Sequence, residues 1–125
     1  MKENYINSEL TSKIIEIFYI VYNKLGYGFI EKVYEKSMLI ELRKHGLDYL
    51  NQESINVYYD NELVGDFYAD IIVEKKVILE LKAVKEILPV HEVQLVNYLK
   101  ATEIEVGLIL NFGPTPKVIR KIFTY

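Results

Sequence analysis

Apolar residues repeat every three or four positions in three separate segments of the chain, the period of an amphipathic helix. The first segment carries a capping residue at its start and glycines after its end, and the second stops at Gly46. The third begins just after Pro89. The predicted helices run from Asn7 or Ser8 to about Leu25, over residues 29–46, and from about Val90 to Thr102.

The segments between and after the last two predicted helices are rich in β-branched and aromatic residues, which favours strands. The predicted strands cover residues 49–59, 62–73, 77–81 and 105–111, and residues 117–123 close the chain as a short strand or helix. The order α-α-β-β-β-α-β-(β/α) predicts an α/β (α+β) fold. We expect a single domain over residues 1–125, with a mixed central β-sheet flanked by helices on both faces.

The charged residues Glu74, Lys75 and Lys76 separate two apolar strands and predict a tight hairpin. A loop of all three would place the carboxylates of Asp70 and Glu80 opposite each other, whereas a two-residue turn would not. The three-residue loop pairs Val73 with Val77, Asp70 with Glu80 and Tyr68 with Lys82. Strand alternation groups Asp66, Tyr68, Asp70 and Ile72 on one face, and Ile78, Glu80 and Lys82 on one face of the next strand. Opposed like charges destabilise a sheet, so we expect a bound divalent cation between them.

The second predicted helix begins with an acidic residue, Glu31. Tyr34, Met38 and Leu42 follow it at helical spacing, so Glu31 should head an apolar stripe that faces the core. Helix geometry alone favours a plainer interpretation, interaction of the carboxylate with the helix dipole. The other acids of this helix, Glu35 and Glu41, are predicted to be surface charges.

On the third predicted helix, His91, Gln94, Leu95 and Tyr98 share one face. A histidine at a helix start is more often a capping or surface residue than a ligand. Gln94 and Tyr98 could likewise form a simple hydrogen-bonded pair.

Composition excludes several classes of protein. The 125 residues include no cysteine, so disulfides and thiolate zinc sites are unavailable, and a reducing cytoplasm is the expected location. No apolar run reaches the roughly 20 residues of a membrane helix. The N-terminal MKENYINSEL is too polar for a signal peptide.

The net charge of −3 at first argues against a nucleic-acid partner. The charge is uneven, however: residues 1–74 carry 7 basic and 13 acidic residues, and residues 75–125 carry 8 basic and 5 acidic ones. The basic part could form a phosphate-facing patch, although a mixed solvated surface is the slightly better interpretation. Its candidates are Lys75, Lys76, Lys85, Lys100, Lys117, Arg120 and Lys121.

The polar residues predicted to point inward combine carboxylates with one lysine: Glu31, Asp70, Glu80, Lys82 and Gln94. Such a set, without cysteine and with little histidine, favours a hard, oxygen-preferring ion such as Mg²⁺ or Mn²⁺. An ion held in this way commonly acts on phosphates, polarising an oxygen and acidifying a bound water. The residues therefore outline a phosphodiester hydrolysis site.

Two motifs resemble a known group of proteins. Asp70, followed by Glu80-Leu81-Lys82 on a strand, resembles the core motif of the PD-(D/E)XK nuclease superfamily, with Ala69 where that motif has proline. Residues 28–34, GFIEKVY, have the form G-x-x-E-x-x-Y, and the chain looks like a member of the GxxExxY protein family. The resemblance extends roughly from Ile14 to Phe123.

The resemblance implies a restriction-endonuclease-like core and a role for each matching residue. Asp70, Glu80 and the backbone carbonyl of Leu81 would bind the metal, and Lys82 would be the catalytic lysine. Glu31 would be the helix-borne acid that completes the site, in place of the dipole interpretation above. Gln94 would act in catalysis, and with Tyr98 it resembles a Q-x-x-x-Y element that holds the site and the nucleic acid. Tyr34 and His91 would contact nucleic acid or support the site.

The expected function is a Mg²⁺- or Mn²⁺-dependent nuclease acting on DNA, with RNA less favoured. The alternative is a catalytically inactive module with a nuclease fold that binds nucleic acid or has a regulatory role. A satisfied ion-pair network without function is the least favoured interpretation, because buried pairs add little stability. No membrane partner is expected, and a homodimer is left open.

Overall fold

The computed structural model describes residues 6–125. The first five residues of the N-terminal MKENYINSEL, for which a signal peptide was not expected, lie outside the described residues. The elements follow the predicted order, and the last one is a strand. They are α1 (Ser8–Leu25), α2 (Glu31–Lys44), β1 (Tyr49–Tyr59), β2 (Glu62–Val73), β3 (Val77–Lys82), α3 (Pro89–Thr102), β4 (Val106–Asn111) and β5 (Lys117–Ile122).

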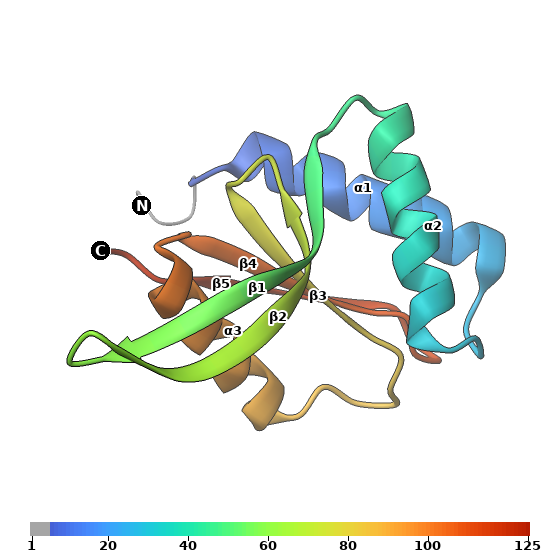
Figure 1. Ribbon diagram of the computed structural model, residues 1–125. Coiled ribbons are helices and arrows are strands. Elements are labelled where there is room, and N and C mark those ends of the chain that lie inside the picture. Colours follow the sequence, from blue (N-terminus) through green and yellow to red (C-terminus); the bar gives the residue numbers. More distant parts are fainter. Residues whose placement is uncertain (1–5) are drawn as a thin grey trace.

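The five strands form one mixed sheet in the order β1-β2-β3-β4-β5 (Figure 1). All neighbours are antiparallel except β3 and β4, which run parallel and are connected through α3. A parallel pair needs such a crossover, because a tight turn cannot join strands that run the same way. β1 and β2 continue beyond the other strands as a long two-stranded ribbon.

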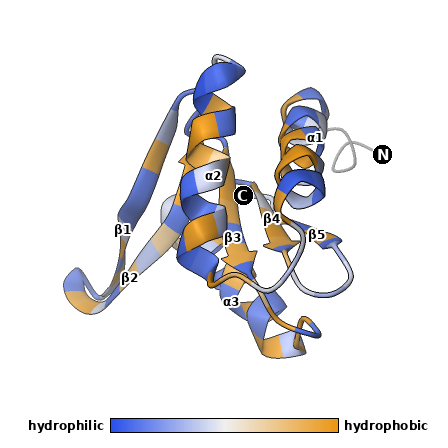
Figure 2. Ribbon diagram, turned by 90° about the vertical axis from the view of Figure 1, so that its right-hand side faces the viewer, coloured by the Kyte–Doolittle hydropathy of each residue, from blue (hydrophilic) through white to orange (hydrophobic). Residues whose placement is uncertain are grey.

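Helices cover both faces of the sheet, as the order of elements predicts. On one face, side chains of α1 and α2 such as Phe18 and Met38 pack against Leu79 of β3 and its neighbours. On the other face, Leu95 and Leu99 of α3 pack against strand residues including Ile78 and Ile109. Hydrophobic residues accordingly dominate β3 and β4 in the middle of the molecule (Figure 2). None of the helices within residues 6–125 is long and apolar enough to span a membrane.

The β2–β3 turn has the predicted three-residue loop. Glu74 and Lys75 adopt positive φ angles of 54° and 56°, and the Lys76 N–H donates to the Val73 carbonyl at 2.9 Å. The pairs Val73–Val77, Ile72–Ile78 and Ile71–Leu79 follow in register. The sequence-based register is therefore confirmed up to Ile71 and Leu79.

The chain that follows β3 is fixed to the end of β4. The buried Asn111 side chain donates to the Val84 carbonyl at 2.9 Å and accepts from the Val84 N–H at 3.0 Å. The Phe112 N–H also donates to the Lys82 carbonyl at 2.7 Å. These bonds fix the backbone at Lys82 and just after it, and so help to determine where its side chain starts.

The basic residues of the C-terminal part do not form one patch. In the sheet register Lys82 and Lys117 both pair with Asn111, whereas Lys75 and Lys76 precede Val77, which lies at the opposite end beside Val106. Lys121 also makes an ion pair with Glu92 at 2.6 Å. The mixed-surface interpretation therefore describes these residues better.

Candidate active site

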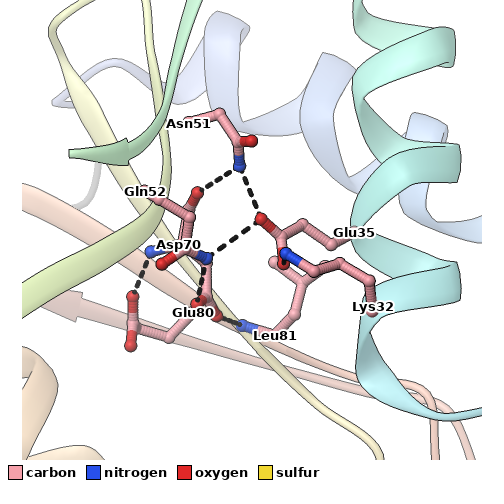
Figure 3. Close-up of polar contacts among 7 residues, drawn as sticks. All are labelled: Lys32, Glu35, Asn51, Gln52, Asp70, Glu80 and Leu81. Carbon is pink, nitrogen blue, oxygen red and sulfur yellow. Dashed lines mark hydrogen bonds and ion pairs between the residues drawn. The ribbon is translucent and has the colours of Figure 1, made fainter.

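Two carboxylates meet where β2 and β3 separate, and we call Asp70, Glu80 and Leu81 the β2–β3 fork (Figure 3). The Asp70 N–H donates to Glu80 Oε2 at 3.0 Å, and the Leu81 N–H donates to Asp70 Oδ2 at 2.8 Å. The backbone ladder ends one residue earlier, at Ile71 and Leu79. Side-chain hydrogen bonds thus replace the predicted ladder pair Asp70–Glu80, and the predicted pair Tyr68–Lys82 is not formed. Asp70 and Glu80 still lie together, as the register requires.

The alternation of β2 is interrupted at Asp70. Ala69 and Ile72 both pack into the cluster beneath α3, although regular alternation would place them on opposite faces. Opposite this point Gln52 of β1 has a left-handed φ of 54°. The prediction that Asp66, Tyr68, Asp70 and Ile72 share one face is therefore wrong. Period-two alternation could not reveal a bend of this kind, which places Asp70 within reach of β3.

Burial and mutual repulsion favour the protonated forms of the fork carboxyls. Burial, followed by the charge of Asp70, raises the pKa of Glu80 to about 8. Burial also raises the pKa of Asp70, and the nearby Glu35 carboxylate adds to this effect. The Lys82 ammonium group acts in the opposite direction on both pKa values, so it lies close to both groups. A site of this kind favours a bound cation, because positive charge restores the ionised pair.

The acids of α2 lie differently from the prediction. Glu31 is exposed at the first residue of the helix and does not face the core, although its charge still contributes to the raised pKa of Glu80. Glu31 therefore lies at the surface near Glu80. Glu35 and Glu41, predicted to be surface charges, are each only 7% exposed. Glu41 is held by Lys44 and Lys24 at 3.2 and 3.5 Å.

Glu35 connects α2 with the fork (Figure 3). Its Oε2 accepts from the amides of Asn51 at 2.5 Å and Gln52 at 3.0 Å, and Lys32 lies 3.5 Å from Oε1. Burial acts to raise the pKa of Glu35, but these hydrogen bonds and the Lys32 charge hold it below the ordinary value. The Gln52 amide also lies 3.4 Å from Asp70 Oδ1. An ionised Glu35 therefore orients groups that contact the fork.

Sequence reasoning missed Glu35, Asn51 and Gln52. One signal was present: Glu35 precedes the buried Met38 and Leu42 by one and two helical turns. Gln52 carried no signal, since its contact depends on an irregular φ angle in β1.

α3 contributes the pair Gln94 and Tyr98 to the fork. The exposed Gln94 amide donates to the Tyr98 hydroxyl at 2.9 Å. Burial raises the pKa of the Tyr98 phenol, as do the charges of Glu80 and Asp70, so the phenol lies near both acids. His91 caps the start of α3, because its Nδ1 accepts a hydrogen bond from the Leu88 N–H at 3.0 Å. This contact matches the capping interpretation of His91.

Tyr34 is completely buried, so it supports the structure and does not offer a contact to nucleic acid. Its hydroxyl donates to the Gly26 carbonyl at 2.7 Å and accepts from the Phe29 N–H at 3.2 Å. Its ring stacks on Phe112, with centroids 4.3 Å apart. Tyr34 therefore fixes the loop that leads into Glu31.

Replacing Tyr34 with phenylalanine is expected to destabilise the protein by about 1–2 kcal/mol, because two backbone groups lose their partner. Urea unfolding would measure this change. The exposed Tyr27→Phe is the matched control and should change stability by less than about 0.5 kcal/mol. Equal stabilities of the two variants would contradict the bracing role of the Tyr34 hydroxyl.

The fork fits a hydrated divalent cation. Among residues 6–125, no three or more His, Asp or Glu side chains form a group that could hold a metal ion. Two carboxylates do converge, and their backbone bonds use only Asp70 Oδ2 and Glu80 Oε2. Mg²⁺ is usually held by one or two carboxylates, with water and phosphate oxygens as further ligands. The remaining oxygens, Asp70 Oδ1 and Glu80 Oε1, match that arrangement.

The chain was compared with known proteins. The family model described as PD-(D/E)XK nuclease superfamily matches residues 8–122, from the start of α1 to the end of β5. The crystal structure of SSO0001 is similar, with a TM-score of 0.59 and 16% sequence identity over 75% of this chain and 50% of that one. This likeness shows the fold alone, and the chain spans half the length of SSO0001. No curated protein matches the chain.

Proposed function

The chain belongs to the PD-(D/E)XK nuclease superfamily, and from this premise we propose that it is a metal-dependent nuclease hydrolysing phosphodiester bonds, in DNA more than in RNA. Its sheet of five strands with three helices is consistent with the restriction-endonuclease-like core of that superfamily. The matched family is the superfamily, so membership of the narrower GxxExxY family stays a prediction. The convergence of Asp70 and Glu80 beside Lys82 supports the proposal most.

In this proposal Asp70, Glu80 and the Leu81 carbonyl hold Mg²⁺ or Mn²⁺. The bound ion would polarise a phosphoryl oxygen and acidify a water molecule. The N–H groups of Asp70 and Leu81 hold the carboxylates of Glu80 and Asp70, respectively, in place. Because these carboxylates are already fixed, they need little reorganisation when the substrate binds.

Lys82, half-buried at the end of β3, supplies positive charge beside the fork. Its ammonium group donates to the phosphate oxygen that gains negative charge as water attacks phosphorus in line with the leaving oxygen. The attacking water gives up a proton to solvent as its oxygen bonds to phosphorus. The bond from phosphorus to the leaving sugar oxygen breaks, and that oxygen takes a proton from solvent. In this proposal the exposed Glu31 of α2 and Gln94 of α3 would orient the attacking water and the phosphate.

The test is cleavage of single- and double-stranded DNA and RNA, with Mg²⁺ or Mn²⁺ and with chelator. We expect cleavage only with metal, and a loss of about a hundredfold or more in Lys82→Met. Lys85→Met is the matched control, since Lys85 is exposed three residues further on, and it should cleave like the wild type. No cleavage by the wild type on any substrate, or equal cleavage by both variants, would contradict the proposal.

Glu35→Ala is expected to lower Mn²⁺ affinity and cleavage by about ten- to a hundredfold, the usual cost of losing a group that orients metal ligands. The change removes the acceptor shared by Asn51 and Gln52. Glu41→Ala is the control, because it removes the other buried glutamate of α2, which pairs with Lys24 and Lys44. Cleavage per folded molecule, from activity and circular dichroism together, should fall only in Glu35→Ala. A similar fall in both variants would assign Glu35 a purely structural role.

The second candidate function is a nuclease fold that binds nucleic acid without cleaving it. Glu31, the acid expected to complete the site, is exposed at the first residue of α2, which favours this alternative. Salt-sensitive binding of nucleic acid, with no cleavage under any metal condition, would support it. For either function we propose a cytoplasmic location, with which the absence of cysteine is compatible.

A further inference from the structure

A groove of about 830 Å³ lies between the β1–β2 ribbon and α3. Residues of β1, β2 and α3 line it, and the ribbon passes in front of α3 in the view of Figure 1. Phe67 of β2 and Tyr98 of α3 meet in the groove, with ring centroids 5.7 Å apart and an angle of 39° between the rings. Tyr58 lines it from β1 and is 61% exposed, so its ring is accessible to a ligand.

The lining combines aromatic rings and aliphatic side chains with amides and one cation. Asn56, Gln94 and Asn97 bring side-chain amides to the groove, and Lys100 brings an ammonium group. Aromatic rings stack on nucleobases of any sequence, while amides hydrogen-bond to base edges. A lysine beside them suits a phosphate. An apolar peptide helix would leave the amides without partners, which is unfavourable.

The groove lies beside the fork, because Phe67, which lines it, precedes Asp70 by three residues on β2. Gln94 and Tyr98 line the groove and are bonded to each other, and Tyr98 also lies near both carboxylates of the fork. A strand whose phosphate lies at Asp70 and Glu80 would therefore have an adjacent nucleotide at the groove. The same α3 residues would contact both parts of the substrate.

We propose that this groove binds an unstacked nucleobase of single-stranded nucleic acid, next to the phosphate held at the fork. The inference rests on the proposed function, because the substrate path is drawn from the fork. Such a groove would also distinguish single strands from duplexes. Bases of a duplex are stacked and paired, so they reach such a groove only after costly unstacking.

Binding without metal tests the groove separately from catalysis. Fluorescence anisotropy in chelator would compare a labelled single-stranded oligonucleotide with a duplex of the same sequence. Three variants are informative: Tyr58→Ala removes a ring from the groove, Asn97→Leu removes an exposed amide, and Tyr59→Ala is the matched control. Tyr59 is 71% exposed and does not line the groove. All three residues are exposed, so folding should be unaffected.

We expect tighter binding of the single strand than of the duplex, about tenfold weaker single-strand binding in Tyr58→Ala, and no more than twofold change in Tyr59→Ala. Asn97→Leu should also weaken binding. Equal affinity for single strand and duplex, equal effects of the two tyrosine variants, or tighter binding by Asn97→Leu would overturn the inference. So would a dimer in sedimentation that Tyr58→Ala dissociates, because a second copy would then fill the groove.

Cleavage of the same oligonucleotides with Mg²⁺ separates the two proposals. Cleavage by the wild type that is unaffected in Tyr58→Ala would reject the groove and retain the nuclease. The expected binding pattern without any cleavage would retain the groove and reject the nuclease.

Discussion

Replacing Glu80 with glutamine is expected to stabilise the protein at pH 8 and to abolish its cleavage of nucleic acid. Burial and the Asp70 charge raise the pKa of Glu80 to about 8, from an ordinary value of 4.5. The glutamine carbonyl can still accept from the Asp70 N–H, as Glu80 does at 3.0 Å. The variant therefore keeps the hydrogen bond and removes the charge.

The direction of the pH effect follows from the raised pKa. The folded protein binds a proton at Glu80 more tightly than the unfolded chain does. The stability from this group is fully present below about pH 4.5 and is lost as pH rises through about 8. In chelator, the wild type should lose stability over this range, whereas Glu80→Gln should lose less.

The proton on Glu80 is partly shared with the neighbouring Asp70, which reduces the effect of removing one charge. We therefore expect Glu80→Gln to be more stable than the wild type by about 2 kcal/mol at pH 8, or roughly 5 °C in melting temperature. The gain should shrink toward pH 5. Added Mg²⁺ or Mn²⁺ should stabilise the wild type and leave Glu80→Gln unchanged. Cleavage should fall by at least about a thousandfold, since a metal ion stabilises the transition state by several kcal/mol.

Thermal melts at pH 5 and pH 8, with chelator or metal, measure the stability effects. Glu86→Gln, an exposed carboxyl after β3, is the control and should behave like the wild type. A Glu80→Gln variant that is less stable than the wild type at pH 8, or that still responds to metal, would contradict the charged-pair account of the fork.

Gly113→Ala is expected to destabilise the protein by at least about 3 kcal/mol. A Cβ at position 113 would lie 2.0 Å from the backbone oxygen of Val84. That carbonyl is held by the Asn111 amide, so it cannot move away without breaking a partly buried hydrogen bond. Because Val84 lies two residues after Lys82, the folded fraction should also lose cleavage activity.

Gly107→Ala is the matched control. The Cβ there would approach Leu95 Cδ1 at 2.7 Å, but this atom is the end of a flexible side chain that can shift. We expect a cost of about 1 kcal/mol. Chemical unfolding of both variants gives the comparison. A Gly113→Ala protein as stable as Gly107→Ala would show that the segment after Lys82 moves freely.

The sequence predicted the elements and the hairpin register well, because both depend on local patterns. Alternation of apolar residues places β1 and β2 with their observed bounds, and the charged Glu74–Lys76 segment predicts the turn. Once the turn length is set, Asp70 and Glu80 must lie across from each other. A local pattern therefore sufficed to place the two central acids.

The surroundings of the fork could not be predicted in the same way. Glu31 precedes an apolar stripe but is exposed, because the helix begins at that residue and its side chain lies at the edge of the core. Glu35 is buried because Asn51 and Gln52 reach it from β1, a contact between segments that only tertiary structure brings together. The interruption at Asp70 depends on the φ angle of Gln52, for which the sequence gives no signal.

The most direct test of the account is a crystal structure soaked with Mn²⁺, with anomalous scattering to locate the ion. The account predicts one strong peak at bonding distance from carboxylate oxygens of both Asp70 and Glu80 and from the Leu81 carbonyl. A peak bound to other residues, or none at the β2–β3 fork in crystals that contain the ion, would contradict it.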